Sequence, residues 1–295
     1  MSDFRLKVFR SVAKNLSFTK ASQDLFISQP AITKHIQELE SAYQTRLFDR
    51  QGSRISLTES GKLLLEHCER ILEDYKRLEY EMHLLHNECT GGLKLGASTT
   101  IAQYVLPPLL AGFIKKFPQV NLSLTNGNSR EVEAALQEHS IDLGLVEGVF
   151  RLPNLKYTTF LEDELVAVVR TGSDLPVGDE ITPGDLLNLP LVLRERGSGT
   201  LDVFERALLQ HHIKLSSLHV LLYLGSTESI KLFLEHTDCI GIVSVRSVTR
   251  ELYSGQLRVV EIKGMPMLRE FSFAQLQGQE SGLAQVFMQF AMRKK

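Results

Sequence analysis

The stretch ISQPAITKHIQELE, residues 27–40, carries the strongest structural signal in the sequence. Ser28 is a suitable helix cap, and Pro30 falls in the first helical turn, where a missing N–H costs nothing because it has no intrahelical partner. Apolar residues recur at helical spacing from Ile32 to Leu39 and define one buried face. The stretch therefore predicts a helix with a well-marked start.

A second face of this helix is polar and free of carboxylates. Gln29, Thr33 and Gln37 follow one another at intervals of four residues, with Lys34 beside them. Phosphate would repel carboxylates, whereas amides and hydroxyls can read base edges in a DNA major groove. Because an ordinary solvent-facing helix can carry the same residues, the interpretation depends on the neighbouring segments.

Two shorter helices are predicted before this one. An apolar stripe predicts the first over roughly residues 3–15, and SFTKASQDL, residues 17–25, predicts a second that is capped by Ser17 or Thr19. A turn at residues 26 and 27 leads into the quoted helix. The arrangement is a helix-turn-helix, whose second helix normally enters the major groove by its N-terminal residues.

A β-hairpin is predicted after the quoted helix. The segment LFDRQGSRISL, residues 47–57, alternates polar and apolar residues around Gly52. Arg50 and Arg54 flank the expected tip. Such a wing is suited to contact with the DNA backbone or the minor groove.

A long helix is predicted from Thr58 to about Glu88, because this segment has no Gly or Pro after Gly61. Its apolar residues alternate spacings of four and three, which is a heptad pattern: Leu64, Cys68, Ile71, Tyr75, Leu78, Met82 and Leu85. Such a seam predicts pairing with a second copy of the chain, which would also supply a second recognition helix. The alternative is that the same face packs within one chain.

Charge is distributed unevenly along the chain, although the total is only -2. Residues 1–62 hold ten Lys and Arg against six Asp and Glu, a net +4, and residues 63–90 hold three against seven, a net -4. A basic N-terminal module followed by an acidic segment indicates that the module meets a polyanion.

After CTGGLKLG, residues 89–96, the pattern alternates strands and helices. The expected strands cover residues 93–97, 120–125, 141–146, 164–170, 190–194, 219–224, 240–244, 257–262 and 268–277. The expected helices cover residues 101–117, 129–139, 200–212, 226–236, 245–253 and 281–293. This succession predicts right-handed crossovers and an α/β fold, with two mostly parallel sheets and a cleft between them.

Ligands of open α/β sheets bind outside the carboxyl ends of the strands. Two of the loops there are hydroxyl-rich helix starts, whose free N–H groups and dipole favour a small anion. The predicted ligand-binding residues are Ser98, Thr99, Thr100, Asn126, Asn128, Glu147, Gly197, Ser198, Gly199, Thr200, Ser226 and Thr227. The same residues also suit plain caps and loops. A highly charged anion further requires Arg194 or Arg196, or a proton or amine of the ligand, to neutralise Glu147.

Other protein classes have weaker support. There is no apolar run of membrane-spanning length and no signal core in MSDFRLKVFR, so we expect a cytoplasmic protein. Cys68, Cys89 and Cys239 form no CxxC, so no disulfide framework, metal site or cofactor is expected. Redox sensing through Cys239, and an enzyme with an accessory DNA-binding module, stay open as alternatives, although HExxH, GxSxG and P-loop motifs are absent.

The first ninety residues resemble the LysR-type transcriptional regulators in SFTKASQDLFISQPAITKHIQELE, LFDRQGSRISLTESG and the long helix that follows. A weaker resemblance continues through LPPLLAGFIKKFPQV, DLGLVEG and GIVS. The resemblance implies three parts: a winged helix-turn-helix over residues 1–58, a dimerising linker helix over 59–90, and a two-lobed effector domain similar to type II periplasmic binding proteins over 91–295, with lobe I at about 91–162 and 266–295 and lobe II at about 163–265.

The resemblance also implies a function, which is sequence-specific promoter binding modulated by a small effector. The hydroxyl-rich helix starts described above indicate that this effector is an anion, and no catalysis is expected. It assigns DNA contact to Ser28, Gln29, Pro30, Thr33, Lys34, Arg50 and Arg54. The expected partners are double-stranded promoter DNA, the effector and further copies of the chain, as a dimer through the linker helix and a homotetramer. RNA polymerase is left open as a partner, and no membrane is expected. One departure is that Tyr43 and Gln44 replace the family's Leu-Gly after the recognition helix, where Gln adopts a left-handed conformation at some cost.

Overall fold

The computed structural model describes residues 4–51, 54–85, 90–148, 151–277 and 282–293. The chain divides into two compact units, Met1–Glu88 and Cys89–Lys295. Each unit has a hydrophobic core of its own. None of the helices in these ranges combines the length and the apolar character that crossing a bilayer requires.

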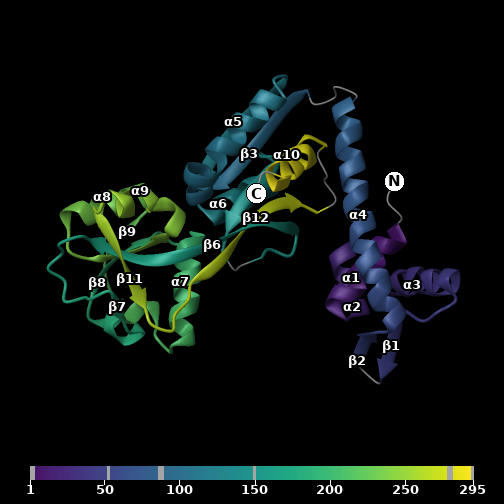
Figure 1. The fold of residues 1–295 in the computed structure, drawn as a ribbon, viewed down its shortest axis with the longest axis horizontal. Coiled ribbons are helices and arrows are strands. Elements are labelled where there is room, and N and C mark those ends of the chain that lie inside the picture. Colours follow the sequence, from purple (N-terminus) through teal and green to yellow (C-terminus); the bar gives the residue numbers. More distant parts are fainter. Residues whose placement is uncertain (1–3, 52–53, 86–89, 149–150, 278–281, 294–295) are drawn as a thin grey trace. The chain divides into compact units, whose positions relative to one another are not determined.

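The N-terminal unit begins with three helices, α1 (Phe4–Asn15), α2 (Phe18–Leu25) and α3 (Gln29–Tyr43) (Figure 1). Ser17 caps α2 and Ser28 caps α3, each by accepting a backbone N–H of the first turn. Phe9 and Val12 of α1 meet Ile32 of α3 in the core, and all three are fully buried. The predicted helix-turn-helix is confirmed.

A hairpin and a long helix complete this unit: β1 (Phe48–Gln51), β2 (Arg54–Leu57) and α4 (Glu59–Leu85). The strands are antiparallel, and Gln51 pairs with Arg54 across the tip, which confirms the predicted wing. In the first turn of α4, a Cβ on Gly61 would stand 2.1 Å from the carbonyl oxygen of Leu47. The approach of α4 to the start of the hairpin therefore requires glycine.

The first half of α4 packs against the core of its own unit. Cys68 and Leu72 are buried there, and the Cys68 thiol donates to the Leu6 carbonyl at 3.3 Å. Further along, Leu78 is 51% exposed and Met82 45% exposed. The prediction of one continuous intermolecular seam is thus wrong for Cys68, because the face turns inward there, whereas Leu78 and Met82 lie on the exposed part of the helix.

The C-terminal unit alternates strands and helices. Its strands are β3 (Gly91–Ser98), β4 (Val120–Gly127), β5 (Leu143–Glu147), β6 (Leu155–Arg170), β7 (Glu180–Ile181), β8 (Pro190–Arg194), β9 (His219–Leu224), β10 (Ile240–Ser244), β11 (Leu257–Ile262) and β12 (Leu268–Leu276). Its helices are α5 (Leu106–Lys116), α6 (Ser129–Gln137), α7 (Gly199–Gln210), α8 (Thr227–His236), α9 (Thr249–Tyr253) and α10 (Gly282–Arg293). A π-helix, η1 (Ile101–Val105), precedes α5, and 3₁₀ turns cover Pro183–Leu187, Leu215–Ser217 and Val245–Ser247.

The strands follow the order β4-β3-β5-β12-β6-β10-β8-β9, with β11 beside β6 and β7 beside β11. We call lobe I the half built from β3, β4 and β5 with α5, α6 and α10, and lobe II the half built from β7 to β11 with α7, α8 and α9 (Figure 1). Parallel pairing dominates within each lobe, while β6 runs antiparallel to both β12 and β10. The predicted two-lobed α/β fold is confirmed, and the strands of the two lobes are joined through β6, which both lobes share.

Most predicted strands and helices of this unit are present, and the main omission is the first half of β6. Residues 155–163 pair with β12 along its length, but only 164–170 were expected as a strand. Exposed polar residues such as Lys156 and Thr159 separate the buried positions Leu155 and Phe160, so the segment looks like a loop in sequence. Long-range pairing with β12 supplies the order that local propensity does not.

Candidate functional sites

The N-terminal end of α3 presents uncharged polar groups and one lysine. The predicted contact residues there occupy the cap and the first turn and a half: Ser28, Gln29, Pro30, Thr33 and Lys34. The side-chain oxygen of Gln29 accepts a 3.5 Å hydrogen bond from the Thr19 hydroxyl, which leaves the amide NH₂ available. The Thr33 hydroxyl donates to the Gln29 carbonyl at 3.1 Å, so it can still accept a hydrogen bond.

The wing contributes the other two predicted contact residues. Arg50 pairs with Ile55 in the hairpin register, and Arg54 follows the tip. The tip at residues 52–53 and the side chains of Arg50 and Arg54 lie outside the described part of the chain. Their predicted contacts with DNA therefore depend on their position in the hairpin.

The transition from α3 to the wing passes through Gln44, which has φ 51 and ψ 36. The predicted left-handed conformation is confirmed at a residue that lacks the freedom of glycine. The Glu40 carboxylate then accepts the backbone N–H groups of Leu47 and Phe48 at 2.8 and 3.4 Å. These bonds fix the direction in which the chain enters the wing.

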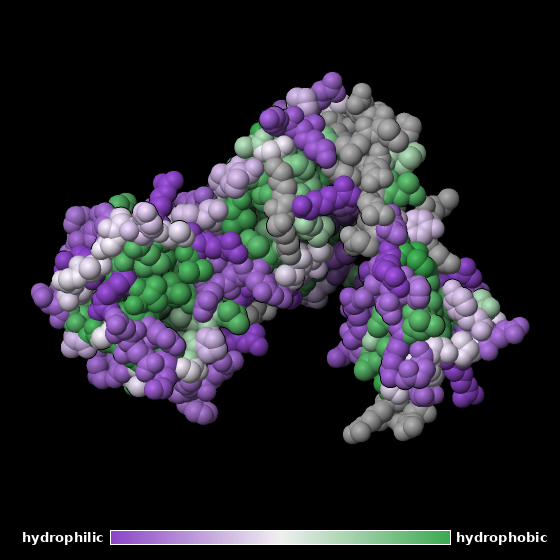
Figure 2. Space-filling view, viewed as in Figure 1, coloured by the Kyte–Doolittle hydropathy of each residue, from purple (hydrophilic) through white to green (hydrophobic). Residues whose placement is uncertain are grey.

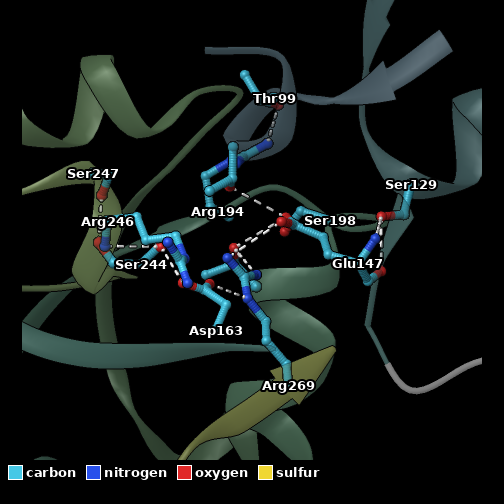
Figure 3. Close-up of polar contacts among 12 residues, drawn as sticks. Thr99, Ser129, Glu147, Asp163, Arg194, Ser198, Ser244, Arg246, Ser247 and Arg269 are labelled. Carbon is cyan, nitrogen blue, oxygen red and sulfur yellow. Dashed lines mark hydrogen bonds and ion pairs between the residues drawn. The ribbon is translucent and has the colours of Figure 1, made fainter. Parts of the chain in front are cut away.

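A network of buried charges joins the two lobes around Arg269 of β12, whose side chain is 0% exposed (Figure 3). Its Nε donates to Asp163 Oδ2 at 2.7 Å and its Nη1 to Thr200 Oγ1 at 3.0 Å, while Nη2 lies 3.2 Å from Glu147 Oε2. Arg246 lies 3.5 Å from Asp163. Two cations thus offset two carboxylates, and the network connects lobe I at Glu147 with lobe II at Thr200.

Glu147 is held by groups from both lobes. Thr100 and Thr200 each donate a hydroxyl to Oε1 at 3.4 Å. The Ser129 hydroxyl donates to the Glu147 carbonyl at 2.8 Å and accepts its N–H at 3.2 Å. Arg269, which is not among the site residues predicted from the sequence, compensates Glu147, whereas Arg194 pairs with Glu195.

Arg194 ends β8 and forms a second buried charge, with a side chain 1% exposed. Its Nε and Nη2 donate to Glu195 at 2.8 and 3.0 Å, and Nη2 also donates to Thr99 at 2.9 Å and to the Gly225 carbonyl at 3.3 Å. Its Nη1 and the Ser98 hydroxyl are buried without a hydrogen-bond partner among the described residues. Unpartnered buried donors are rare, and these two belong to the carboxyl ends of parallel strands, where small ligands bind.

Several other predicted ligand-binding residues have structural roles. Asn128, Ser198 and Ser226 cap α6, α7 and α8, and each side chain accepts a first-turn N–H. Thr227 is buried at the start of α8, and Asn126 is exposed on β4. The structure therefore places Thr99, Thr100, Glu147 and Thr200 in the hydrogen-bond network at the junction of the lobes. Ser98 is buried at the end of β3, next to Thr99 in the chain. The helix starts and β4 hold the remaining five: Asn126, Asn128, Ser198, Ser226 and Thr227.

The predicted glycines bring the backbones of the two lobes close together. A Cβ on Gly199 would stand 2.3 Å from the carbonyl oxygen of Glu147, and the adjacent Gly148 has φ +114. Gly197 has φ +93, a conformation that side chains disfavour. Glycine is needed here for backbone packing and for a turn.

A further contact between the lobes lies at η1. The Tyr104 hydroxyl donates to Glu228 of α8. Lys231 lies 2.8 Å from both Glu228 and Glu251, and its ammonium lies 5.2 Å from the centre of the Tyr104 ring. Burial, followed by the hydrogen bond to Glu228, raises the pKa of Tyr104 well above its usual value, so the hydroxyl stays a donor.

Our sequence-based interpretation missed Arg269, Asp163 and Tyr104. A usable signal existed for Arg269, which is in phase with the buried Phe271 and Phe273 along β12. A charge in phase with buried aromatic residues indicates a paired, buried charge. Its partner Asp163 is 106 positions away, and no local pattern connects the two residues.

The described cysteines give no support to redox sensing. Cys68 and Cys239 are both fully buried, and burial raises the pKa of each thiol to about 11. Such thiols are protonated at neutral pH and are poor nucleophiles. Cys89 lies outside the described residues.

Comparison with known families identifies both units. The model of the bacterial regulatory helix-turn-helix protein, lysR family, matches residues 4–62, and the model of the LysR substrate binding domain matches residues 86–294.

Individual proteins match over most of the chain. The chain is 34% identical to the uncharacterized HTH-type transcriptional regulator YeiE of Escherichia coli (strain K12), over 88% of this chain and 85% of that protein. It is 30% identical to the HTH-type transcriptional regulator CysL of Bacillus subtilis (strain 168), over 91% of this chain and 89% of that protein. A solved structure of the Synechocystis PCC6803 CcmR regulatory domain in complex with 2-PG is 29% identical, with a TM-score of 0.63, and covers 70% of this chain and 97% of that one.

Proposed function

The chain belongs to the LysR family of bacterial transcriptional regulators, and we propose from this premise how it contacts DNA and how a small ligand alters that contact. It is a sequence-specific DNA-binding regulator with a C-terminal effector-binding domain. We propose the domain limits 1–58, 59–90 and 91–295, a cytoplasmic location beside the promoter, and no catalytic step.

We propose that α3 lies in the major groove with Gln29 and Thr33 facing base edges. Three observations support this placement. Gln29 is exposed, its side chain is oriented by the hydrogen bond from Thr19, and the first turn of α3 carries no carboxylate. Lys34, Arg50 and Arg54 contact phosphates or a narrow minor groove and so set affinity rather than sequence choice.

Binding titrations over matched and altered duplexes test these roles. Gln29→Ala should relax sequence choice, with a loss of about 1–3 kcal/mol of discrimination at one base pair. Arg54→Ala should weaken all duplexes similarly and reduce the salt slope by about 1. The reverse pattern would exchange the two assignments.

We propose that the chain dimerises through the second half of α4 and forms a tetramer through its C-terminal units. Leu78 and Met82 supply an exposed apolar stripe on α4. Apolar side chains also gather over the edge strand β9 (Figure 2), where Leu221 is 42% and Leu222 41% exposed. Exposed apolar surfaces of this kind are typical of interfaces.

Two leucines of α4 separate dimerisation from folding. Leu78→Ala should lower the dimerisation constant in sedimentation while the melting temperature at high protein concentration changes little. Leu72 is only 3% exposed, so Leu72→Ala leaves a cavity in the core. The substitution should lower the unfolding free energy by about 2–5 kcal/mol at every protein concentration. A monomeric wild-type chain at micromolar concentration would reject the dimer.

We propose that the effector is a small anion with one or two charges, bound where β3 and β8 end. The observation that carries this proposal is a pair of buried donors, Ser98 Oγ and Arg194 Nη1, that have no hydrogen-bond partner within the described ranges. Glu147 does not oppose an anion, because Arg269 already compensates it. Glu195 offsets part of the Arg194 charge, which disfavours ligands with a high negative charge.

Thermal shifts with sulfate, sulfite, phosphate and small carboxylates test the ligand class. Ser98→Ala should weaken the active anion about tenfold or more, because a hydrogen bond to a charged group contributes about 1.5–3 kcal/mol. Ser217→Ala, at an exposed hydroxyl, is the matched control. A shift only with neutral or cationic compounds, or full affinity in Ser98→Ala, would reject the proposal.

We propose that the bound anion favours one arrangement of the lobes and thereby changes how C-terminal units pack. Paired α3 helices would then change their spacing on DNA, as a population shift between two assemblies. Footprints with and without the active anion should differ in length, and identical footprints would contradict this coupling. RNA polymerase is a candidate partner for the promoter-bound assembly.

A further inference from the structure

A large aromatic side chain is exposed to solvent in the turn between α2 and α3. Phe26 follows α2 and is 63% exposed, the highest value among the large hydrophobic side chains described in the N-terminal unit. It lies two residues before Ser28, the cap of α3. The core of the unit therefore gains little from this ring.

The backbone at Phe26 is also unfavourable for a bulky residue. It has φ 54 and ψ 37, a left-handed conformation that glycine and asparagine adopt most readily. The turn itself is fixed by neighbouring groups, since the Ile27 N–H donates to the Ser22 carbonyl at 3.2 Å and Ile27 packs on the core. Neither burial nor backbone preference accounts for phenylalanine here, and such conflicts with local rules are typical of functional positions.

The surroundings of Phe26 suit DNA. Gln29 lies three residues after Phe26, and its side chain accepts a hydrogen bond from Thr19 of α2. The nearest carboxylate in sequence, Asp24, is occupied by the Asn15 amide at 2.5 Å and the Ser11 hydroxyl at 3.2 Å. An exposed aromatic ring in the turn that leads into these polar residues can contact the one apolar group that base edges present in the major groove, the C5-methyl group of thymine.

We propose that Phe26 is a specificity-determining residue that packs on a thymine methyl group beside the base pairs reached by Gln29. The inference rests on the proposed placement of α3 in the major groove. A contact with phosphate or sugar alone would give the ring no sequence preference, so the proposal makes a base-specific claim.

The test uses the full-length chain and a duplex of about 40 base pairs that wild type selects from a random library. Each thymine is replaced singly by deoxyuridine, which removes the methyl group and keeps the base pair. At one thymine in each half-site, this replacement should weaken binding of the wild-type protein about fourfold. This is the ratio of affinities expected when one buried methyl group is removed. Wild-type affinity that is unchanged at every thymine would overturn the proposal.

Phe26→Gly then links the effect to the ring. It should bind the parent duplex about five- to tenfold more weakly and should no longer distinguish thymine from deoxyuridine at that position. Gln44→Gly is the matched control, because it places glycine at a second left-handed position, φ 51, after α3. The two variants should have similar melting temperatures, and Gln44→Gly should bind like wild type.

Three results would overturn the inference: full affinity in Phe26→Gly, a methyl effect that persists in Phe26→Gly, or a melting temperature far below that of Gln44→Gly. The last result would show that the ring supports the fold. If Gln29→Ala leaves sequence choice unchanged, the placement of α3 fails. If Gln29→Ala relaxes it while Phe26→Gly has no effect, only the role of Phe26 fails.

Discussion

The polar end of α3 and the charge network around Arg269 are built in opposite ways. On α3, Gln29 is exposed and its partners Thr19 and Thr33 are 10 and 4 positions away. Arg269 is buried, and its partners Asp163 and Thr200 are 106 and 69 positions away. A surface that reads an external partner keeps its donors available, whereas a junction between lobes uses them internally. Substitutions should therefore affect binding in the first region and stability in the second.

The largest loss of stability is expected for Arg269→Leu. It leaves the carboxylates of Glu147 and Asp163 buried without their shared cation, which should cost about 3–5 kcal/mol of unfolding free energy. The comparison variant is Lys263→Ala, whose 3.3 Å pair with Glu180 is exposed and should contribute about 1 kcal/mol or less. Urea unfolding of both variants measures the difference. Equal losses would contradict the assigned importance of the network.

A smaller loss is expected for Gly199→Ala, because its Cβ would collide with the Glu147 carbonyl. Overpacking of this kind should cost about 1–3 kcal/mol and loosen the contact between the lobes. Gly282→Ala adds the same methyl group at the start of α10, where no atom of the described residues lies within 4 Å, and should be neutral or slightly stabilising. Calorimetric melting of both variants decides whether backbone contact is the cause.

A smaller, pH-dependent effect is expected at Glu133 of α6. Burial raises the pKa of this carboxyl above its ordinary 4.5, although the Tyr157 hydroxyl donates to it at 2.6 Å. The folded state then holds its proton to higher pH than the unfolded state does, so stability falls as pH rises above about 4.5. Glu133→Gln cannot titrate at this position, so its stability should lack this dependence on pH. The difference in melting temperature, wild type minus variant, should therefore decrease as the pH rises. A difference that is flat or rises would refute the assigned direction.

The smallest change in stability is expected for Lys34→Ala on α3, within about 0.5 kcal/mol of wild type. Its affinity for every duplex should nevertheless fall, and the slope of log affinity against log salt should decrease by about 1. Denaturation and salt titration of one preparation measure both quantities. Loss of stability together with unchanged DNA binding would remove the contrast between the two regions.

The features predictable from sequence are those set by neighbours along the chain. The cap at Ser28 and the alternation of strands and helices follow from local spacing and local backbone preference, whereas the left-handed Gln44 was indicated only by the resemblance to the family. The first half of β6 and the pairing of Arg269 with Asp163 depend on a strand more than a hundred residues away. Thr100 and Thr200 were predictable as hydroxyls at helix starts, but their shared bond to Glu147 was not.

The seating of Cys68 and Leu72 in the same core as α1 and α3 makes α4 and the DNA-reading helices one rigid piece. About three and a half turns of α4 continue past Leu72, from its bounds and the 3.6-residue turn. In the proposed dimer, a rotation of this extension would therefore turn each α3 helix together with α4, without changing the structure of either DNA-binding unit.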